Sequence, residues 1–128
     1  MKHLMIDIYG IDQSLLESRS VLLATLNELP EIIGMQKAAE PSLEEIKTSN
    51  ALDDGMSGFV IICTSHVSLH AWPPYGMLNL DVFSCNDFET EVVKEYLREH
   101  FEIQRADMEM NEIERATRSP REAMLHPV

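Results

Sequence analysis

The stretch from Gly55 to Cys85 concentrates the residue types that can do chemistry. It holds both cysteines, two of the five histidines, the only tryptophan and three of the five glycines. Within it, Thr64 to His66, Ser68 and His70 are polar residues in a run where a buried strand would be apolar. Burying hydroxyl and imidazole groups costs free energy unless they are hydrogen-bonded or take part in a reaction. This stretch is therefore the candidate site.

The elements that carry these residues look like two strands and a turn. Residues 58–71 and 77–85 are rich in Val, Ile, Leu and Phe, and the segment between them holds two prolines and a glycine. A hairpin symmetric about Pro74 puts Cys85 opposite Cys63 and Phe83 opposite Ser65, so that Cys85 lies close to Ser65 on the same face. His70 is five residues from Ser65, so in an unbroken strand it faces the other side. We expect a bulge at residues 64–66 if the two side chains meet.

The rest of the chain predicts the layers around this hairpin. Apolar residues alternate over 3–9, as in a strand, and recur at helical spacing over 12–29 and 86–101. Alternation around Ala106, Met108 and Met110 predicts a final strand, and residues 117–128 are expected to form a loosely ordered tail. The order predicts an α+β fold, a two-layer sandwich in which two helices pack on one face of an antiparallel sheet.

The helix ends and the segment 31–54 are less defined. Ser14 with Glu17, and later Asn86 with Glu89, have the spacing of capping boxes, although Asp12 competes for the first cap. Pro30 is expected to end the first helix. Residues 32–35 suit a short strand, residues 39–46 suit a loop, a helical turn or an edge strand, and residues 50–55 suit a loop.

Size and charge restrict the function classes. We expect 128 residues, with a mass of 14.6 kDa, to form a single domain over residues 1–128. A net charge of −12 disfavours binding to nucleic acid or to anionic membranes and favours small cationic ligands. The sequence has no signal-peptide layout and no apolar run near the roughly 20 residues of a membrane span. We expect a cytoplasmic protein whose two cysteines are free thiols.

Three motifs carry a resemblance to a known family. They follow one another as Gly55-x-Ser57-Gly58, Ser65-His66-x-x-x-His70-x-Trp72-Pro73-x-x-Gly76 and Asp81-Val82-Phe83-x-Cys85. Together they resemble the prokaryotic S-adenosylmethionine decarboxylase proenzyme, a self-cleaving and pyruvoyl-dependent enzyme. The resemblance is dense over residues 55–101, weaker in the N-terminal strand and helix, and faint in 31–54 and after 115. Several spaced elements in one order are more specific than a single short motif.

The resemblance implies a role for each residue. Ser65 would attack the Thr64 carbonyl, His70 would remove the Ser65 α-proton, and the chain would be cleaved between Thr64 and Ser65. Ser57 matches the accessory processing serine of the family. The new terminus becomes a pyruvoyl group that forms a Schiff base with the substrate and acts as electron sink. Cys85 matches the proton donor to the α-carbon, since a thiol with a pKa of about 8.5 is largely protonated at neutral pH.

The implied activity is that of a carboxy-lyase. Such an enzyme makes the aminopropyl donor for spermidine and other polyamines, and the resemblance also implies a homodimer of cleaved protomers with active sites near the interface. The chain departs from the family at Thr64, where relatives usually carry Glu, and at Ala71 and Pro74. These departures motivate a rival, a pyruvoyl decarboxylase of the same fold that acts on arginine or ornithine. A third interpretation is an uncleaved homologue that serves as a binding or regulatory subunit.

Each residue also has a purely structural interpretation. A strand serine is usually a satisfied hydroxyl, and His66 is interpreted as a hydrogen-bonded sheet residue. Cys63 is expected to fill space, with a disulfide between Cys63 and Cys85 as the alternative in an oxidising setting. His66 and His70 lack a third partner for a metal, so no metal site is predicted.

Overall fold

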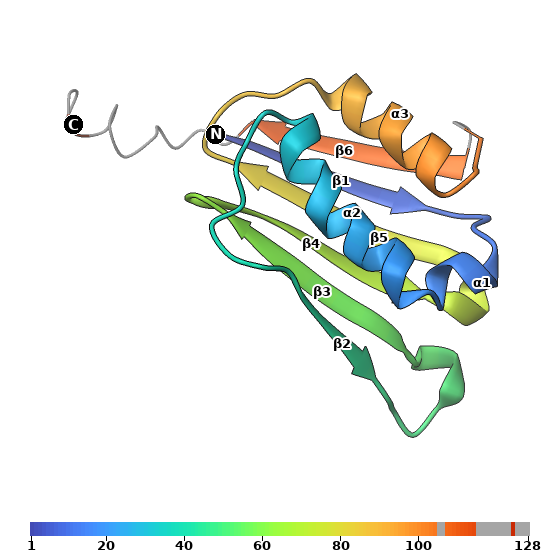
Figure 1. Cartoon of the computed structure of the whole chain (residues 1–128). Coiled ribbons are helices and arrows are strands. Elements are labelled where there is room, and N and C mark those ends of the chain that lie inside the picture. Colours follow the sequence, from blue (N-terminus) through green and yellow to red (C-terminus); the bar gives the residue numbers. More distant parts are fainter. Residues whose placement is uncertain (105–106, 115–123, 125–128) are drawn as a thin grey trace.

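The protein is a single antiparallel sheet with helices on one face. The computed structural model describes residues 1–104, 107–114 and 124. The strands lie in the order β2-β3-β4-β5-β1-β6, and α2 and α3 cover the same face (Figure 1). The strands are β1 (Lys2–Ile8), β2 (Ser42–Ile46), β3 (Gly55–Ile62), β4 (Ser65–Trp72), β5 (Met77–Ser84) and β6 (Met108–Glu114). The helices are α1 (Gln13–Leu16), α2 (Arg19–Ile32) and α3 (Thr90–His100), with 3₁₀ turns η1 (Ala51–Asp53) and η2 (Pro73–Tyr75). The predicted α+β two-layer sandwich is confirmed.

The core lies between the sheet and the helices. Alternate residues of each central strand are buried against the helices, for example Leu4, Ile6 and Ile8 in β1. Leu22, Leu26 and Leu29 recur at helical spacing along α2 and are fully buried. The other face of the sheet, called the open face below, has no helix packed on it among the described residues (Figure 1). In those same residues no helix is long and apolar enough to cross a bilayer.

The predicted hairpin is in fact two consecutive hairpins. Residues 58–71 do not form one strand, because the chain turns at Cys63 and Thr64 and returns as β4 beside β3. The second turn, at η2 between β4 and β5, lies where the prolines predicted it. The extra turn places the Thr64–Ser65 bond at the tip of a hairpin.

The predicted pairing of β4 with β5 is wrong by one residue. His66 pairs with Phe83 and Val67 with Val82, so Phe83 is not opposite Ser65. Continued by two residues, this register puts Cys85 opposite Thr64 and not opposite Cys63. The physical reason is the core: Val67 and Val82 are both fully buried, and the predicted register would have set buried residues opposite open-face residues.

The helix ends differ from the predicted ones. The first helical segment breaks into α1, capped by Asp12, and α2, where the Ser18 side chain accepts the Val21 N–H. The capping box at Ser14 is therefore wrong, and so is the one at Asn86, since α3 starts after Glu89. Pro30 lies inside the last turn of α2 instead of ending it.

The segments that the sequence left less defined, residues 31–54 and the C-terminal part, differ in their outcomes. Residues 32–35 form the end of α2 and a turn, not a strand, whereas the edge-strand alternative for 39–46 is confirmed as β2. The loop at 50–55 contains the 3₁₀ turn η1. The predicted final strand is confirmed as β6, although Ala106 lies outside the described residues. The predicted tail 117–128 also lies outside them, apart from Met124.

Candidate active site

The Thr64–Ser65 bond follows a strained backbone position. Cys63 has φ 55°, a left-handed conformation that L-residues other than Asn, Asp and Gly rarely adopt. Thr64 completes the turn, and Ser65 is the first residue of β4, with 4% of its surface exposed. Its side chain lies on the helix-covered side of the sheet, in line with Val67 and Leu69. The bond therefore joins an exposed turn to a buried strand.

Cys85 contacts both residues of this bond. Its backbone N–H donates to Ser65 Oγ at 2.9 Å, and the Thr64 hydroxyl donates to its sulfur at 3.1 Å. Hydrogen bonding to the thiol from the side chain of Thr64 first and that of Ser65 second lowers the pKa of Cys85. The predicted proximity of Cys85 to Ser65 is confirmed, and their shortest hydrogen bond joins the Cys85 backbone N–H to Ser65 Oγ.

His70 and Ser57 form a second cluster on the open face. They are cross-strand partners in β4 and β3, and His70 Nδ1 lies 2.8 Å from Ser57 Oγ. His70 is exposed and Ser57 is half-buried. An imidazole paired with a hydroxyl can accept and return a proton, which is the chemistry of a general base.

The two clusters are separate within one chain. Strand β4 is regular from Ser65 to Trp72, so Ser65 faces the helices and His70 faces the open side. Five residues of strand also put about 17 Å between them. The bulge that would bring His70 to Ser65 is absent from β4, and the structure does not bring these two predicted partners together.

A cavity of about 460 Å³ adjoins the His70 cluster. Its lining residues are Ile46, Thr48, Asp53, Gly55, Ser57, His70, Ala71 and Trp72. The Trp72 indole gives it an aromatic wall, and Asp53 gives it a carboxylate. Both groups attract cations, by cation–π and by Coulomb interaction. The cavity therefore suits a positively charged small molecule beside a proton acceptor.

Comparison with known proteins agrees with this chemistry. Residues 2–116 match the model of the family described as S-adenosylmethionine decarboxylase. The chain belongs to this family. A protein named S-adenosylmethionine decarboxylase proenzyme from Archaeoglobus fulgidus is 33% identical over 86 residues, which are 67% of this chain and 71% of that protein.

Two further relatives carry the same name. The protein from Thermoanaerobacter sp. (strain X514) is 34% identical over 88 residues, which are 67% of this chain and 64% of that protein. The protein from Clostridium botulinum (strain Loch Maree / Type A3) is 27% identical over 107 residues, which are 83% of this chain and 87% of that protein. The match to the Thermoanaerobacter protein thus spans less than two thirds of its length.

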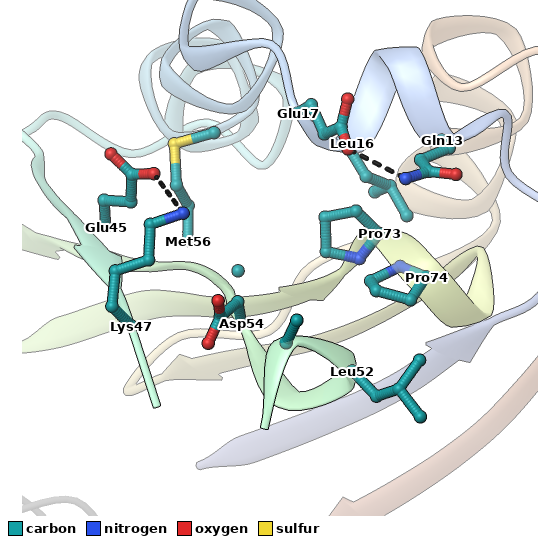
Figure 2. A pocket seen from close by; sticks show the side chains of 12 residues that line it. Gln13, Leu16, Glu17, Glu45, Lys47, Leu52, Asp54, Met56, Pro73 and Pro74 are labelled. Atoms are coloured by element: carbon teal, nitrogen blue, oxygen red, sulfur yellow. Dashed lines mark hydrogen bonds and ion pairs between the residues drawn. The ribbon is translucent and has the colours of Figure 1, made fainter. Parts of the chain in front are cut away.

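Another cavity of this family member, about 500 Å³, lies beside the site and not in it. Figure 2 shows its walls, with Pro73 and Pro74 facing the Glu45–Lys47 ion pair across the opening. Gly55 lines both cavities. None of the predicted processing residues lines this second cavity, whereas Ser57 and His70 line the cavity of about 460 Å³, and Ser65 and Cys85 line neither.

The remaining predicted residues of the family motifs have other surroundings. The His66 ring packs on Phe83 at a centroid distance of 5.5 Å. Cys63 is exposed and its sulfur lies 3.7 Å from the Gln36 carbonyl oxygen, so the interpretation of Cys63 as a space-filling residue is wrong. Cys63 and Cys85 are both free, which excludes the disulfide alternative in this structure.

Asn79 and Asp7 are linked by hydrogen bonds to the cavity residue Trp72 and were not identified from the sequence. The Trp72 indole N–H donates to Asn79, and Asn79 donates to Asp7. The signal was present in the alternation of β1 and β5, which puts Asp7 and Asn79 on the open face with His70.

Proposed function

We propose that this chain is a self-processing, pyruvoyl-dependent decarboxylase that acts on S-adenosylmethionine. Such an enzyme is a carboxy-lyase, and its product is the aminopropyl donor for spermidine and other polyamines. Family membership and the word proenzyme in the relatives' names support the reaction. The observation that carries the proposal is that Cys85 is hydrogen-bonded to both residues of the Thr64–Ser65 peptide bond. The two free thiols suit a cytoplasmic location.

The processing step uses groups of this chain. Ser65 Oγ forms a bond to the Thr64 carbonyl carbon while the bond from that carbon to the Ser65 nitrogen breaks, which converts the amide to an ester. A base then takes the Ser65 α-proton, and the ester oxygen leaves with Thr64 as a carboxylate. Water hydrolyses the resulting enamine, after tautomerisation to the imine, and releases ammonia. The left-handed Cys63 favours the reaction, because cleavage releases the strained turn.

The surroundings of residue 65 fit the pyruvoyl group. The Ser65 Cβ, which would become the methyl group, lies on the apolar side of the sheet in line with Val67. When present, the pyruvoyl carbonyl supplies an electron sink for loss of CO₂. Cys85 remains beside it as the proton donor, with a sulfur held by hydrogen bonding in the uncleaved chain.

The separation of the two clusters supports a homodimer. His70 and Ser57 lie on the other face from the Ser65 side chain and about 17 Å along the strand, so they act on a Ser65 of another copy. A second sheet would pack on the open face, the side that carries His70 and Ser57. That face also exposes Phe59 (47%) and Ile61 (44%), as expected of an interface.

Mixing two inactive variants tests the processing and the shared site together. The Ser65→Ala chain keeps His70, and the His70→Ala chain keeps Ser65. If the site is shared, mixing the two variants lets His70 of the Ser65→Ala chain promote cleavage of the Thr64–Ser65 bond in the His70→Ala chain. We expect two fragments from the His70→Ala chain in the mixture and none when either variant is incubated alone. Intact-mass analysis reads the result. Cleavage of His70→Ala alone would refute the role of His70, and a mixture that stays uncleaved would refute the shared site.

A substrate panel tests the reaction. Release of CO₂ is measured from carboxyl-labelled S-adenosylmethionine, arginine and ornithine with cleaved enzyme. We expect turnover of S-adenosylmethionine. Turnover of arginine or ornithine without turnover of S-adenosylmethionine would contradict the proposed substrate and support the rival decarboxylase. A single 14.6 kDa species after long incubation would instead favour an uncleaved binding subunit.

A further inference from the structure

Trp72, Asn79 and Asp7 form a line of hydrogen bonds across three neighbouring strands. Trp72 Nε1 lies 2.7 Å from Asn79 Oδ1, and Asn79 Nδ2 lies 2.7 Å from Asp7 Oδ1. The residues belong to β4, β5 and β1, which lie side by side (Figure 1). All three side chains are on the open face and half-buried.

The chemistry of the three groups allows one arrangement. An indole N–H can only donate, and an ionised carboxylate can only accept. The amide between them must therefore turn its oxygen to Trp72 and its nitrogen to Asp7. Neither Asp nor Leu, which have nearly the same size as Asn, can make both bonds. Asp7 thus fixes the amide of Asn79, and the fixed amide holds the indole.

Trp72 is the aromatic wall of the cavity that holds the His70–Ser57 pair. A half-buried indole on an open sheet face has rotamer freedom that a ligand would have to remove on binding. The hydrogen bond that the indole donates to Asn79 removes this freedom beforehand, and a preorganised wall binds its ligand more tightly than a mobile one.

We propose that Asn79 and Asp7 are positioning residues that hold the Trp72 ring ready to receive the cationic group of the substrate. The proposal rests on the proposed decarboxylase function for the identity of the ligand. The hydrogen bonds that join Trp72, Asn79 and Asp7, called the tether below, are a property of the uncleaved chain. Asn79 is hydrogen-bonded to Trp72, and Asp7 is hydrogen-bonded to Asn79. We therefore expect both residues to affect substrate binding and not the chemical step.

Fluorescence tests the tether without any activity. Trp72 is the only tryptophan, so the emission of a Ser65→Ala proenzyme reports on this one ring. We expect Asn79→Leu to raise the acrylamide quenching constant and lower the anisotropy, with Asp7→Ala causing a smaller change in the same direction. Asp7→Asn keeps an acceptor and should retain most of the parental signal. Asn27→Leu on α2, also a half-buried asparagine with a hydrogen bond, is the matched control and should change neither quantity. Unchanged quenching and anisotropy in Asn79→Leu would overturn the proposal.

Kinetics of the cleaved enzyme test the consequence for binding. We expect Asn79→Leu to raise KM for S-adenosylmethionine roughly three- to tenfold with kcat within about twofold, and to cleave itself at the parental rate. Trp72→Phe keeps a ring but removes the N–H, so adding Asn79→Leu to it should raise KM no further. An additive effect in this double variant, or a loss of kcat at unchanged KM, would overturn the positioning role. If the enzyme turns over none of the substrates, the proposed function fails and the fluorescence result still decides the tether.

Discussion

At the scale of single residues, the departure at Thr64 changes the surroundings of the thiol. The resemblance implies Glu at this place, whereas here a neutral hydroxyl donates to Cys85 Sγ at 3.1 Å. A donated hydrogen bond stabilises a thiolate, and a neighbouring carboxylate would destabilise it. In the uncleaved chain Thr64 therefore favours ionisation of Cys85, and the pKa of this thiol lies below its ordinary value. The sequence alone suggested an unperturbed thiol because the contact depends on a turn that it did not predict.

Replacing Thr64 should shift the pH at which Cys85 reacts. Only the thiolate is alkylated, so a lowered pKa moves the reactivity midpoint to lower pH and loss of the hydrogen bond moves it back up. In a Ser65→Ala background, we expect Thr64→Val to raise the midpoint of iodoacetamide alkylation at Cys85, and Thr64→Ser to leave it in place. Peptide mapping separates Cys85 from the exposed Cys63. Equal midpoints for Val and Thr would show that this hydroxyl does not act on the thiol.

At the scale of elements, the sequence predicted the layers better than the turns. Each helix or strand has one side toward the core and one side toward solvent, so its apolar residues recur at helical or alternating spacing. This spacing can be read from the local sequence. The turn at Cys63 and Thr64 has no glycine, proline or asparagine, so residues 58–71 looked like one strand. A signal was nevertheless present. Core positions are even-numbered in β3, such as Val60 and Ile62, and odd-numbered in β4, such as Val67 and Leu69. This change of parity shows that the strand is interrupted between them, by a turn or by a bulge.

Strand β3 depends on close approach of its neighbours at Gly58. A Cβ there would lie 2.5 Å from the Ser42 carbonyl oxygen in β2 and 2.8 Å from Leu43 Cδ1. We expect Gly58→Ala to lower the free energy of unfolding by about 2–3 kcal/mol, because β2 must move away from β3. Since β3 carries Ser57, self-cleavage should slow as well. Urea unfolding of Ser65→Ala proteins measures the first effect, and intact mass over time in the Ser65 protein measures the second.

Gly34 provides the control for this substitution. A Cβ at Gly34 meets no atom within 4 Å, but φ of +75° makes any side chain strained. Gly34→Ala should cost about 1–2 kcal/mol and leave self-cleavage unchanged. If Gly58→Ala is no more destabilising than Gly34→Ala and cleaves at the parental rate, the close packing of β2 on β3 does not govern the site.

At the scale of the whole molecule, the sheet is covered by helices on one face only, and one chain by itself does not bring the two clusters of the proposed site together. The helices cover one face, and the open face carries His70, Ser57 and Trp72 together with exposed apolar side chains. The sequence indicated the half-covered sheet from the order of its elements. The five-residue spacing of Ser65 and His70 already put them on opposite faces of an unbroken strand, and the structure shows that β4 is unbroken. Assembly and processing are therefore coupled in the proposed enzyme.

A charge placed on the open face tests this coupling. Ile61 is 44% exposed on β3 opposite His66, and Val92 is 46% exposed on α3. In a homodimer formed through the open face, Ile61→Glu buries a carboxylate beside a second copy that already has a charge of −12, whereas Val92→Glu adds the same charge to the helical layer. We expect Ile61→Glu to weaken dimerisation at least about tenfold by analytical ultracentrifugation. Self-cleavage at micromolar concentration should slow in parallel and recover as the protein is concentrated. Val92→Glu should match the parent in both measurements. A parent that is monomeric while it cleaves itself, with a rate independent of concentration, would show that one chain holds the whole site after all.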